Sequence, residues 1–351
     1  LAGYAKIEAE EDSTGYVRIK LEGQQFVQDN KCNHIGLTEE KGTGFYTPYW
    51  PHITTQESYM PVFSDVALPS ALAERVGCTQ TTNIATSLNN DIGSLKALLV
   101  SRGSEYGTYD FMSEENYSRV EDNVVMETQA EISYLARNIM VAMNDIFCPN
   151  TTYTAADGTT YTVLDTANCS VGADGSLPPH ELFAREGYDR YTQMEIDGRQ
   201  FYVYNDETKA NNSSWYKLGN VSVNSKLAAQ VTLMPSYKQD GSANYGLADQ
   251  ITKAWSAENL YINPKDTSKC NFEGYYDKII SHLGTNGSIY KASSDTMTST
   301  AAAIDNQRNQ IMGVSSDEEL TNMIKYQSAY NASSRFITVI SQMTELIVQL
   351  I

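Results

Sequence analysis

The sequence from residue 313 to residue 350 decides which fold the chain can adopt, and it reads GVSSDEELTNMIKYQSAYNASSRFITVISQMTELIVQL. Its apolar side chains recur mostly at intervals of three, four, or six to seven residues, as on one face of an α-helix. The residues of this face are Leu320, Ile324, Tyr326, Tyr330, Ile337, Ile340, Met343, Ile347 and Leu350. The pattern predicts a helix from about Asp317 to Leu350, about 50 Å long at 1.5 Å rise per residue.

Polar residues mark the start of this helix. Ser316 is a candidate N-cap, and Glu319 three residues later completes a capping box. Asp317 and Glu318 add negative charge at the positive end of the helix dipole. A second long helix is predicted upstream, and Gly313 ends it. Its apolar residues are Ile289, Met297, Ile304 and Ile311.

An apolar strip of this length exceeds the size of a typical single domain. It resembles the seam of a coiled coil and is unstable alone in water, so something must cover it. The strip is either covered by its own core, as in an ordinary core helix, or buried between subunits. We expect burial between subunits, because an open head-to-tail interface generates a helical tube. The tail would then become ordered on assembly.

The first 150 residues predict a core domain. Residues 1–35 are predicted to form strands, because Val17, Ile19 and Leu21 alternate with polar residues. Residues 36–82 are irregular, since four prolines keep any helix there short.

Two helices are predicted to follow these strands. The first spans residues 84–100 and stops at Gly103; its apolar residues are Ile84, Leu88, Ile92, Leu95 and Leu99. The second spans about 115–147 and ends before Pro149. Its apolar stripe consists of Ile132, Leu135, Ile139, Met143 and Ile146.

Residues 151–270 predict an inserted, mainly β domain. Asp157-Gly158 and Asp197-Gly198 are typical hairpin dipeptides. Further strands are predicted around Val221 and Val223, and around Val231 and Leu233. The fold class is therefore α+β and elongated: a helical and β core domain (1–150), an outer β-rich domain (151–270) and C-terminal helices that return to the core and form an assembly helix (271–351).

Charge and cysteine content narrow the function classes. The chain has 43 acidic and 25 basic residues and a formal net charge of −18. Such a surface repels phosphate backbones and anionic lipid, which argues against nucleic acid and membrane surfaces as partners. No apolar run reaches the roughly 20 residues that a membrane span needs. Five scattered cysteines predict free, partly buried thiols, with one disulfide as the alternative.

No catalytic, cofactor-binding or metal site is predicted. His180-Glu181 begins an H-E-x-x-H zinc motif, but Ala184 stands where the second histidine belongs. Acidic pairs such as Glu10-Glu11 are typical of solvated surfaces. The chain contains neither a phosphate-binding glycine loop nor a nucleophile elbow. The many tyrosines of residues 151–270 leave a carbohydrate-binding groove open as an alternative.

The stretch from residue 313 also resembles a known family. The motif residues are Gly313, Val314, Asp317, Glu318, Glu319, Gln327, Ala329 and Ala332. This GVS-DEE turn and the YQ-AY-A helix after it resemble the C-terminal signature of the hook-associated protein 1 family, the subunits at the flagellar hook–filament junction. Hook and rod proteins usually enter the related helix through an Asn-Val turn. Upstream, GYVRIKLEGQQFV (15–27) and the helix with Leu135-Ala136-Arg137 are similar to the same family.

The resemblance implies a non-catalytic, secreted subunit of the extracellular flagellum that binds copies of itself, the neighbouring hook and junction proteins and, before export, a chaperone. It also implies an N-terminal helix that would precede Leu1. A hook protein or other axial subunit is one alternative. A surface adhesin or carbohydrate-binding module built on the β domain is another, and an enzyme is the third.

Overall fold

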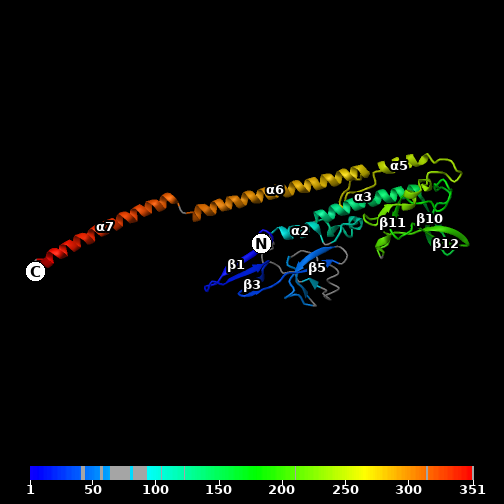
Figure 1. Ribbon diagram of the computed structural model, residues 1–351. Coiled ribbons are helices and arrows are strands. Elements are labelled where there is room, and N and C mark those ends of the chain that lie inside the picture. Colours follow the sequence, from blue (N-terminus) through cyan, green and yellow to red (C-terminus); the bar gives the residue numbers. More distant parts are fainter. Residues whose placement is uncertain are drawn as a thin grey trace. The chain divides into compact units, whose positions relative to one another are not determined.

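A computed structural model describes residues 1–40, 44–55, 58–63, 80–81, 93–103, 105–121, 123–209, 211–313 and 315–349 (Figure 1). The chain divides into two units, Leu1–Gly284 and Thr285–Ile351. The boundary lies inside one continuous helix, α6 (Phe272–Met312). Helices and separate, mostly antiparallel sheets make the fold α+β, as predicted. The domain boundaries predicted near residues 150 and 270 stay a prediction.

The first sheet is an antiparallel meander of four strands. These are β1 (Ile7–Glu11), β2 (Val17–Leu21), β3 (Gln24–Gln28) and β4 (Lys31–Cys32), in that order. Glu22 and Gly23 both have positive φ, which gives the tight turn whose twist matches the strands. The strands predicted for residues 1–35 are confirmed. Burial along β2 is graded rather than alternating, since Leu21 is buried and Val17 is exposed.

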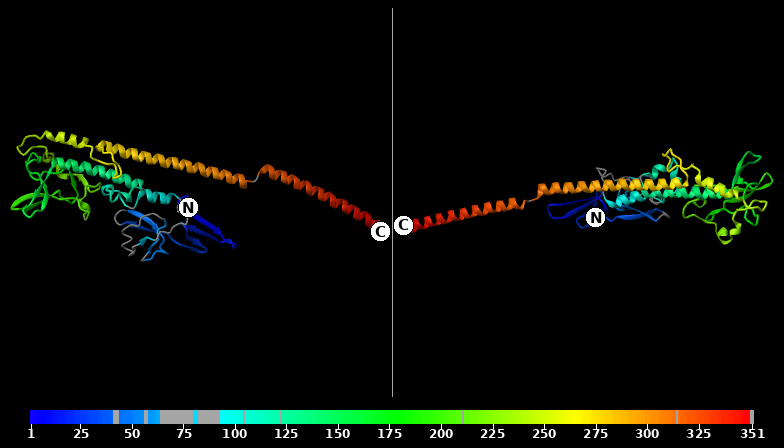
Figure 2. Two further views of the ribbon diagram at one scale, coloured as in Figure 1. Left: turned by 180° about the vertical axis from the view of Figure 1, so that it is seen from behind. Right: turned by 90° about the horizontal axis from the view of Figure 1, so that it is seen from above.

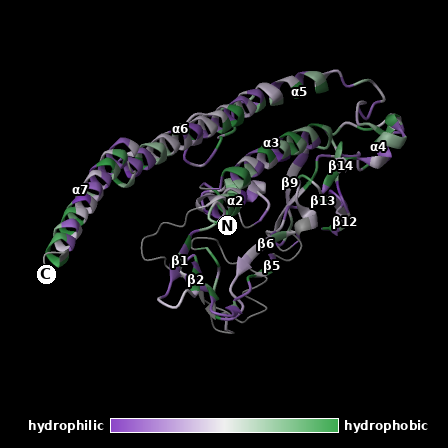
Figure 3. Cartoon of the chain, turned by 60° about the vertical axis from the view of Figure 1, so that its left-hand side comes forward, coloured by the Kyte–Doolittle hydropathy of each residue, from purple (hydrophilic) through white to green (hydrophobic). Residues whose placement is uncertain are grey.

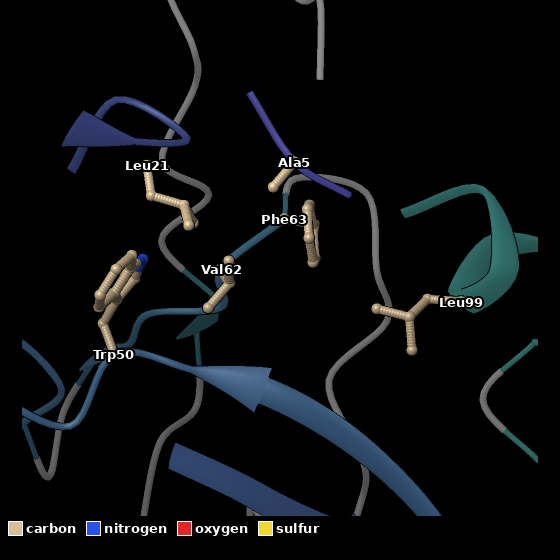
Figure 4. Packing of buried hydrophobic residues seen from close by; sticks show 6 residues of the cluster. All are labelled: Ala5, Leu21, Trp50, Val62, Phe63 and Leu99. Atoms are coloured by element: carbon tan, nitrogen blue, oxygen red, sulfur yellow. The ribbon is translucent and has the colours of Figure 1, made fainter. Parts of the chain in front are cut away.

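Trp50 anchors the core beneath this sheet. It follows the hairpin of β5 (Gly36–Glu40) and β6 (Phe45–Tyr49) and is completely buried. Its backbone N–H donates to the Met60 carbonyl at 2.9 Å. The buried cluster contains Ala5, Leu21, Trp50, Val62, Phe63 and Leu99 (Figure 4). A short parallel pair, β7 (Ser58–Tyr59) with β8 (Gln80–Thr81), lies in the same part of the chain.

Helix α2 (Ser94–Arg102) brings Leu99 to that core. It ends where predicted, because Gly103 adopts φ 78° and its N–H donates to the Leu99 carbonyl at 3.1 Å. At the other end of α2, the Ser94 and Leu95 amides donate to the carbonyls of Gly3 and Tyr4. The predicted residues Ile84, Leu88 and Ile92 lie outside the described residues.

Helix α3 (Val124–Phe147) is the long helix of the first unit, and it starts later than predicted. Two 3-10 turns, η1 (Tyr109–Met112) and η2 (Tyr117–Arg119), precede it. They replace the predicted helical start at 115, because turns at these positions fold Phe111 and Tyr117 back onto Met126 in one buried cluster.

The buried face of α3 also differs from the predicted stripe. Met143 is buried, and Leu135 and Ile139 pack against another cluster, but Ile132 is 42% exposed. The most buried positions of α3 include Glu127, Glu131 and Asn144. Hydrogen-bond partners on neighbouring segments make these polar positions compatible with burial, and an apolar pattern cannot show such partners.

The β-rich segment follows α3. One sheet has the order β12 (Tyr191–Ile196), β13 (Arg199–Tyr204), β10 (Thr160–Leu164) and β9 (Asn150–Thr154), and β11 (Phe183–Arg185) pairs with β14 (Val221–Val223). Both predicted hairpin turns are confirmed, with positive φ at Gly158, Asp197 and Gly198.

The strand predicted around Val231 and Leu233 is wrong. These residues form a 3-10 turn, η4 (Val231–Leu233), directly after the short helix α4 (Ser225–Ala229). Pro235 follows closely, so the segment is too short to pair as a strand. Helix α5 (Gly246–Ser256) comes next and buries Leu247.

The start of α6 packs within the first unit. Tyr275 and Ile279 are buried with Leu260, Ile262, Cys270 and Phe272, and Leu135 and Ile139 of α3 pack against them. Cys148, Cys169 and Cys270 are buried free thiols and Cys32 is an exposed one, so the prediction of free thiols is confirmed for these four. Cys78 lies outside the described residues.

Candidate assembly surface

Helix α7 (Ser316–Gln349) is the helix predicted from the opening stretch, and it starts one residue earlier than expected. The capping residue is Ser315, not Ser316: the Glu318 amide donates to Ser315 Oγ at 3.4 Å and the Glu319 amide to its carbonyl at 2.9 Å. The acidic residues occupy the first turn, as predicted. The cap is therefore shifted by one residue from the predicted position, and Glu318 rather than Glu319 stands three positions after it.

Gly313 separates α6 from α7. Its N–H donates to the Asn309 carbonyl at 2.7 Å. A Cβ atom at this position would lie 2.1 Å from that carbonyl oxygen, so no other residue fits without a shift of the backbone. The predicted end of α6 at Gly313 is confirmed. Val314, which belongs to the same motif, lies outside the described residues.

The apolar side chains of α7 are all exposed. Among those predicted for assembly, the exposed fraction runs from 47% for Ile340 to 74% for Tyr326 and Tyr330. Leu350 lies outside the described residues. Further exposed apolar residues, which the spacing analysis missed, are Met323, Phe336, Val339, Leu346 and Val348. Only the hydropathy of these residues, and not their spacing, could have added them to the prediction. Together, the exposed apolar side chains of α7 are called here the α7 surface.

The α7 surface winds around its helix rather than following one straight line. Met323 and Ile324 lie about one turn after Leu320 and share its face. Ile340 lies 20 residues after Leu320, about five and a half turns at 3.6 residues per turn, which places it on roughly the opposite face. Figure 3 colours each residue by its hydropathy, and hydrophobic and hydrophilic residues are mixed along the whole of α7. One narrow partner groove cannot cover both groups of residues.

Charge is distributed unevenly along α7. Asp317, Glu318 and Glu319 lie in the first turn, whereas Glu345 is the sole charged residue from 336 to 348. The motif residues Gln327, Ala329 and Ala332 are exposed near the middle of the helix. Helix α7 therefore begins with charged residues and becomes more apolar toward its C-terminal end, and burial of that end is favourable.

The part of α6 beyond the unit boundary presents a similar surface. Apart from the partly buried Asn286, the side chains from Thr285 to Met312 are exposed, and the apolar ones include Ile289, Met297, Ile304 and Ile311. Figure 2 shows this stretch as one continuous helix. Many residues of this stretch are Ser or Thr. Several of their hydroxyls donate to the carbonyl four residues earlier, as Thr296 does to Ala292 at 2.8 Å. Among the described helices, none combines the length and hydropathy that crossing a membrane requires.

Comparison with known proteins places the α7 surface in a class. Residues 306–350 match the family described as flagellar basal body rod FlgEFG protein C-terminal. The matched segment contains the end of α6, the Gly313 break and α7. This segment is therefore similar to the C-terminal part of axial proteins of the bacterial flagellum.

Within that class, a stretch of 90 residues is 38% identical to Flagellar hook-associated protein 1 of Bacillus subtilis (strain 168). The match covers 25% of this chain and 17% of the length of that relative. The resemblance predicted from the motif residues is therefore confirmed over this part of the chain.

Proposed function

We propose that the chain is a structural, non-catalytic subunit of the bacterial flagellum that assembles through the α7 surface at the hook–filament junction. The observation that carries this proposal is α7 itself: a 34-residue helix whose described apolar side chains are all exposed, within a segment matched to flagellar rod proteins. Fully burying one Leu or Ile side chain contributes about 1.5–3 kcal/mol, so covering this surface strongly favours assembly.

The proposed partners follow from the same surface. Further copies of the chain and the neighbouring hook and junction proteins cover α7 in the assembled axis. Because the α7 surface winds around the helix, more than one neighbour contacts each copy. Before export, a chaperone shields the same side chains from water and from premature assembly. The assembled protein is extracellular, and a net charge of −18 disfavours nucleic acid as a partner.

Deletion of residues 317–351 tests the assembly role. We expect the truncated protein to keep the fold of the first unit, which has its own buried clusters, and to lose assembly. Circular dichroism and thermal melting check the fold, and electron microscopy of cells carrying the truncated protein checks the flagella. A matched control replaces Lys209, an exposed residue of the first unit, with Ala. Normal flagella on cells with the truncated protein would refute the proposal.

A hook or rod subunit is the second candidate, and the family matched by residues 306–350 favours it specifically. The two candidates differ in location. Immunogold labelling of the β-rich segment should mark a single site at the hook–filament junction. Label along the hook or in the basal body would instead assign the chain to another axial subunit.

A further inference from the structure

Three side chains that can ligate a metal converge where α3 meets the start of α6. Glu127 and Glu131 lie one turn apart on α3, and His282 projects from α6. One ligand atom from each of these residues lies within 4.8 Å of the other two. All three residues belong to the first unit. The sequence analysis predicted no metal site, because the ligands lie far apart in the chain and match no spacing motif.

Both carboxylates of this cluster are deeply buried, with exposed fractions of 3% for Glu127 and 1% for Glu131. Glu131 Oε1 lies 2.9 Å from His282 Nδ1, and Glu127 Oε1 accepts a hydrogen bond from the Tyr117 hydroxyl at 2.6 Å. Two buried carboxyl groups so close together are stabilised either by a bound proton or by a nearby positive charge, because burial strongly disfavours an uncompensated ion.

Basic side chains of the described residues do not supply enough of that charge. Lys265 lies 5.5 Å from the centre of the Tyr117 ring, but its ammonium group pairs with Glu121. His282 pairs with Glu131 and can compensate one carboxylate at most. Among the described residues, no Lys or Arg forms an ion pair with Glu127. A cation bound between the three side chains would complete the charge balance.

We propose that Glu127, Glu131 and His282 bind one divalent transition-metal ion of the zinc class. Two carboxylates and an imidazole form a mixed oxygen and nitrogen ligand set that suits Zn²⁺ better than Mg²⁺ or Ca²⁺, which prefer oxygen ligands. Ligand atoms about 2 Å from a tetrahedral zinc ion are about 3.3 Å apart, so the separations between these atoms, all within 4.8 Å, need to shrink by at most about 1.5 Å. Water completes the coordination, and the Tyr117 hydroxyl orients Glu127.

Such an ion has a structural role. His282 lies just before Gly284, the last residue of the first unit. The metal therefore ties α6 to α3 at the place where α6 leaves that unit, next to the buried Tyr275 and Ile279. Binding at this place stabilises the first turns of α6 against fraying, because a ligand that binds only the folded state stabilises it.

Isothermal titration calorimetry, in which Zn²⁺ is titrated into the metal-free full chain, tests the site. A Cys32→Ser background removes the exposed thiol, which is a competing ligand. We expect one ion per chain and a rise in melting temperature on binding. His282→Gln and Glu131→Gln should each abolish both effects, whereas His34→Gln, at an exposed histidine, should change neither. Tyr117→Phe should weaken binding about 10- to 100-fold.

Two outcomes would overturn the proposal. One is the absence of stoichiometric Zn²⁺ binding by the Cys32→Ser chain. The other is binding that persists unchanged in His282→Gln, which would indicate an adventitious ion only. Circular dichroism of each variant establishes that it is folded. If Glu131→Gln fails to fold, His282→Gln alone decides, because the His282 side chain is one-third exposed and tolerates substitution.

Discussion

At the scale of the residue, small polar networks hold the start of α6 in place. The Asp266 carboxylate accepts hydrogen bonds from Lys278 Nζ at 2.6 Å and from the Ser268 amide at 3.0 Å. Lys278 also donates to the Ser268 carbonyl at 2.8 Å. The loop before α6 is therefore tied to the second turn of that helix. The hydrogen bond from Lys278 is the largest cause that lowers the pKa of Asp266 to about 2.

This pKa predicts a pH dependence. A carboxyl group whose pKa is lower in the folded state contributes stability above its ordinary pKa of 3.8, and that contribution is lost as the pH falls through about 2. Asp266→Asn should therefore lower the free energy of unfolding by about 1 kcal/mol at pH 7, since partial exposure screens the pair. The gap from the unsubstituted chain should narrow below about pH 4. Urea denaturation at several pH values measures this difference in the free energy of unfolding. A difference that stays constant down to pH 3 would contradict the lowered pKa of Asp266.

At the scale of the element, α7 is a helix stabilised by its ends and left uncovered along its length. Ser315 caps it, Gly313 separates it from α6, and the acidic first turn favours its N-terminus. Nothing within the helix itself removes its apolar side chains from water. An isolated helix of this kind is marginal, and its stability depends on what covers it.

The winding of the α7 surface predicts that two distant substitutions act alike. Leu320→Asn and Ile340→Asn alter roughly opposite faces, so both should reduce assembly if neighbours cover the whole surface. Neither should change the melting temperature of the unassembled chain by more than a degree or two, because both side chains are about half exposed. Thr338→Asn, on the same helix, is the polar control. Sedimentation velocity with the assembly partners measures how far each variant assembles. If only one of the two substitutions reduced assembly, neighbours would cover a single face of α7.

At the scale of the whole molecule, the two units differ in how they are stabilised. Among the described residues, the first unit contains four buried apolar clusters, whereas the side chains of the second from Thr285 to Val348 are exposed, except for the partly buried Asn286. We therefore expect the stability of the second unit to depend on the proposed partners and that of the first unit to depend on its own core.

Limited proteolysis should reveal this difference. Trypsin should cleave the unassembled chain first after Lys291, Arg308, Lys325 or Arg335, because these residues lie in the uncovered unit. Arg137, which pairs with Glu207 in the first unit, should resist cleavage under the same conditions. Assembly should protect the four early sites. Early cleavage within α3 would contradict the expectation that the first unit is the more stable of the two.

Local pattern was sufficient for several elements. Elements that depend on neighbouring residues were predicted correctly. These are the hairpin turns at Asp157-Gly158 and Asp197-Gly198, the helix ends at Gly103 and Gly313, and the course of α7. The strand expected at Val231 was wrong, because a nearby helix and Pro235 decide its conformation rather than its β propensity. The late start of α3 has the same kind of cause, since contacts of Phe111 and Tyr117 with Met126 select the turns.

The sequence by itself determined the terminal helix, its exposed apolar residues and the motif that links it to flagellar axial proteins, because each of these depends on residues within a few turns of one another. Only the tertiary structure decided which positions of α3 are buried and that Glu127, Glu131 and His282 meet. The physical reason is distance along the chain. A buried carboxylate is tolerated only beside its partner, and the packing of α6 against α3 brings that partner from about 150 residues away.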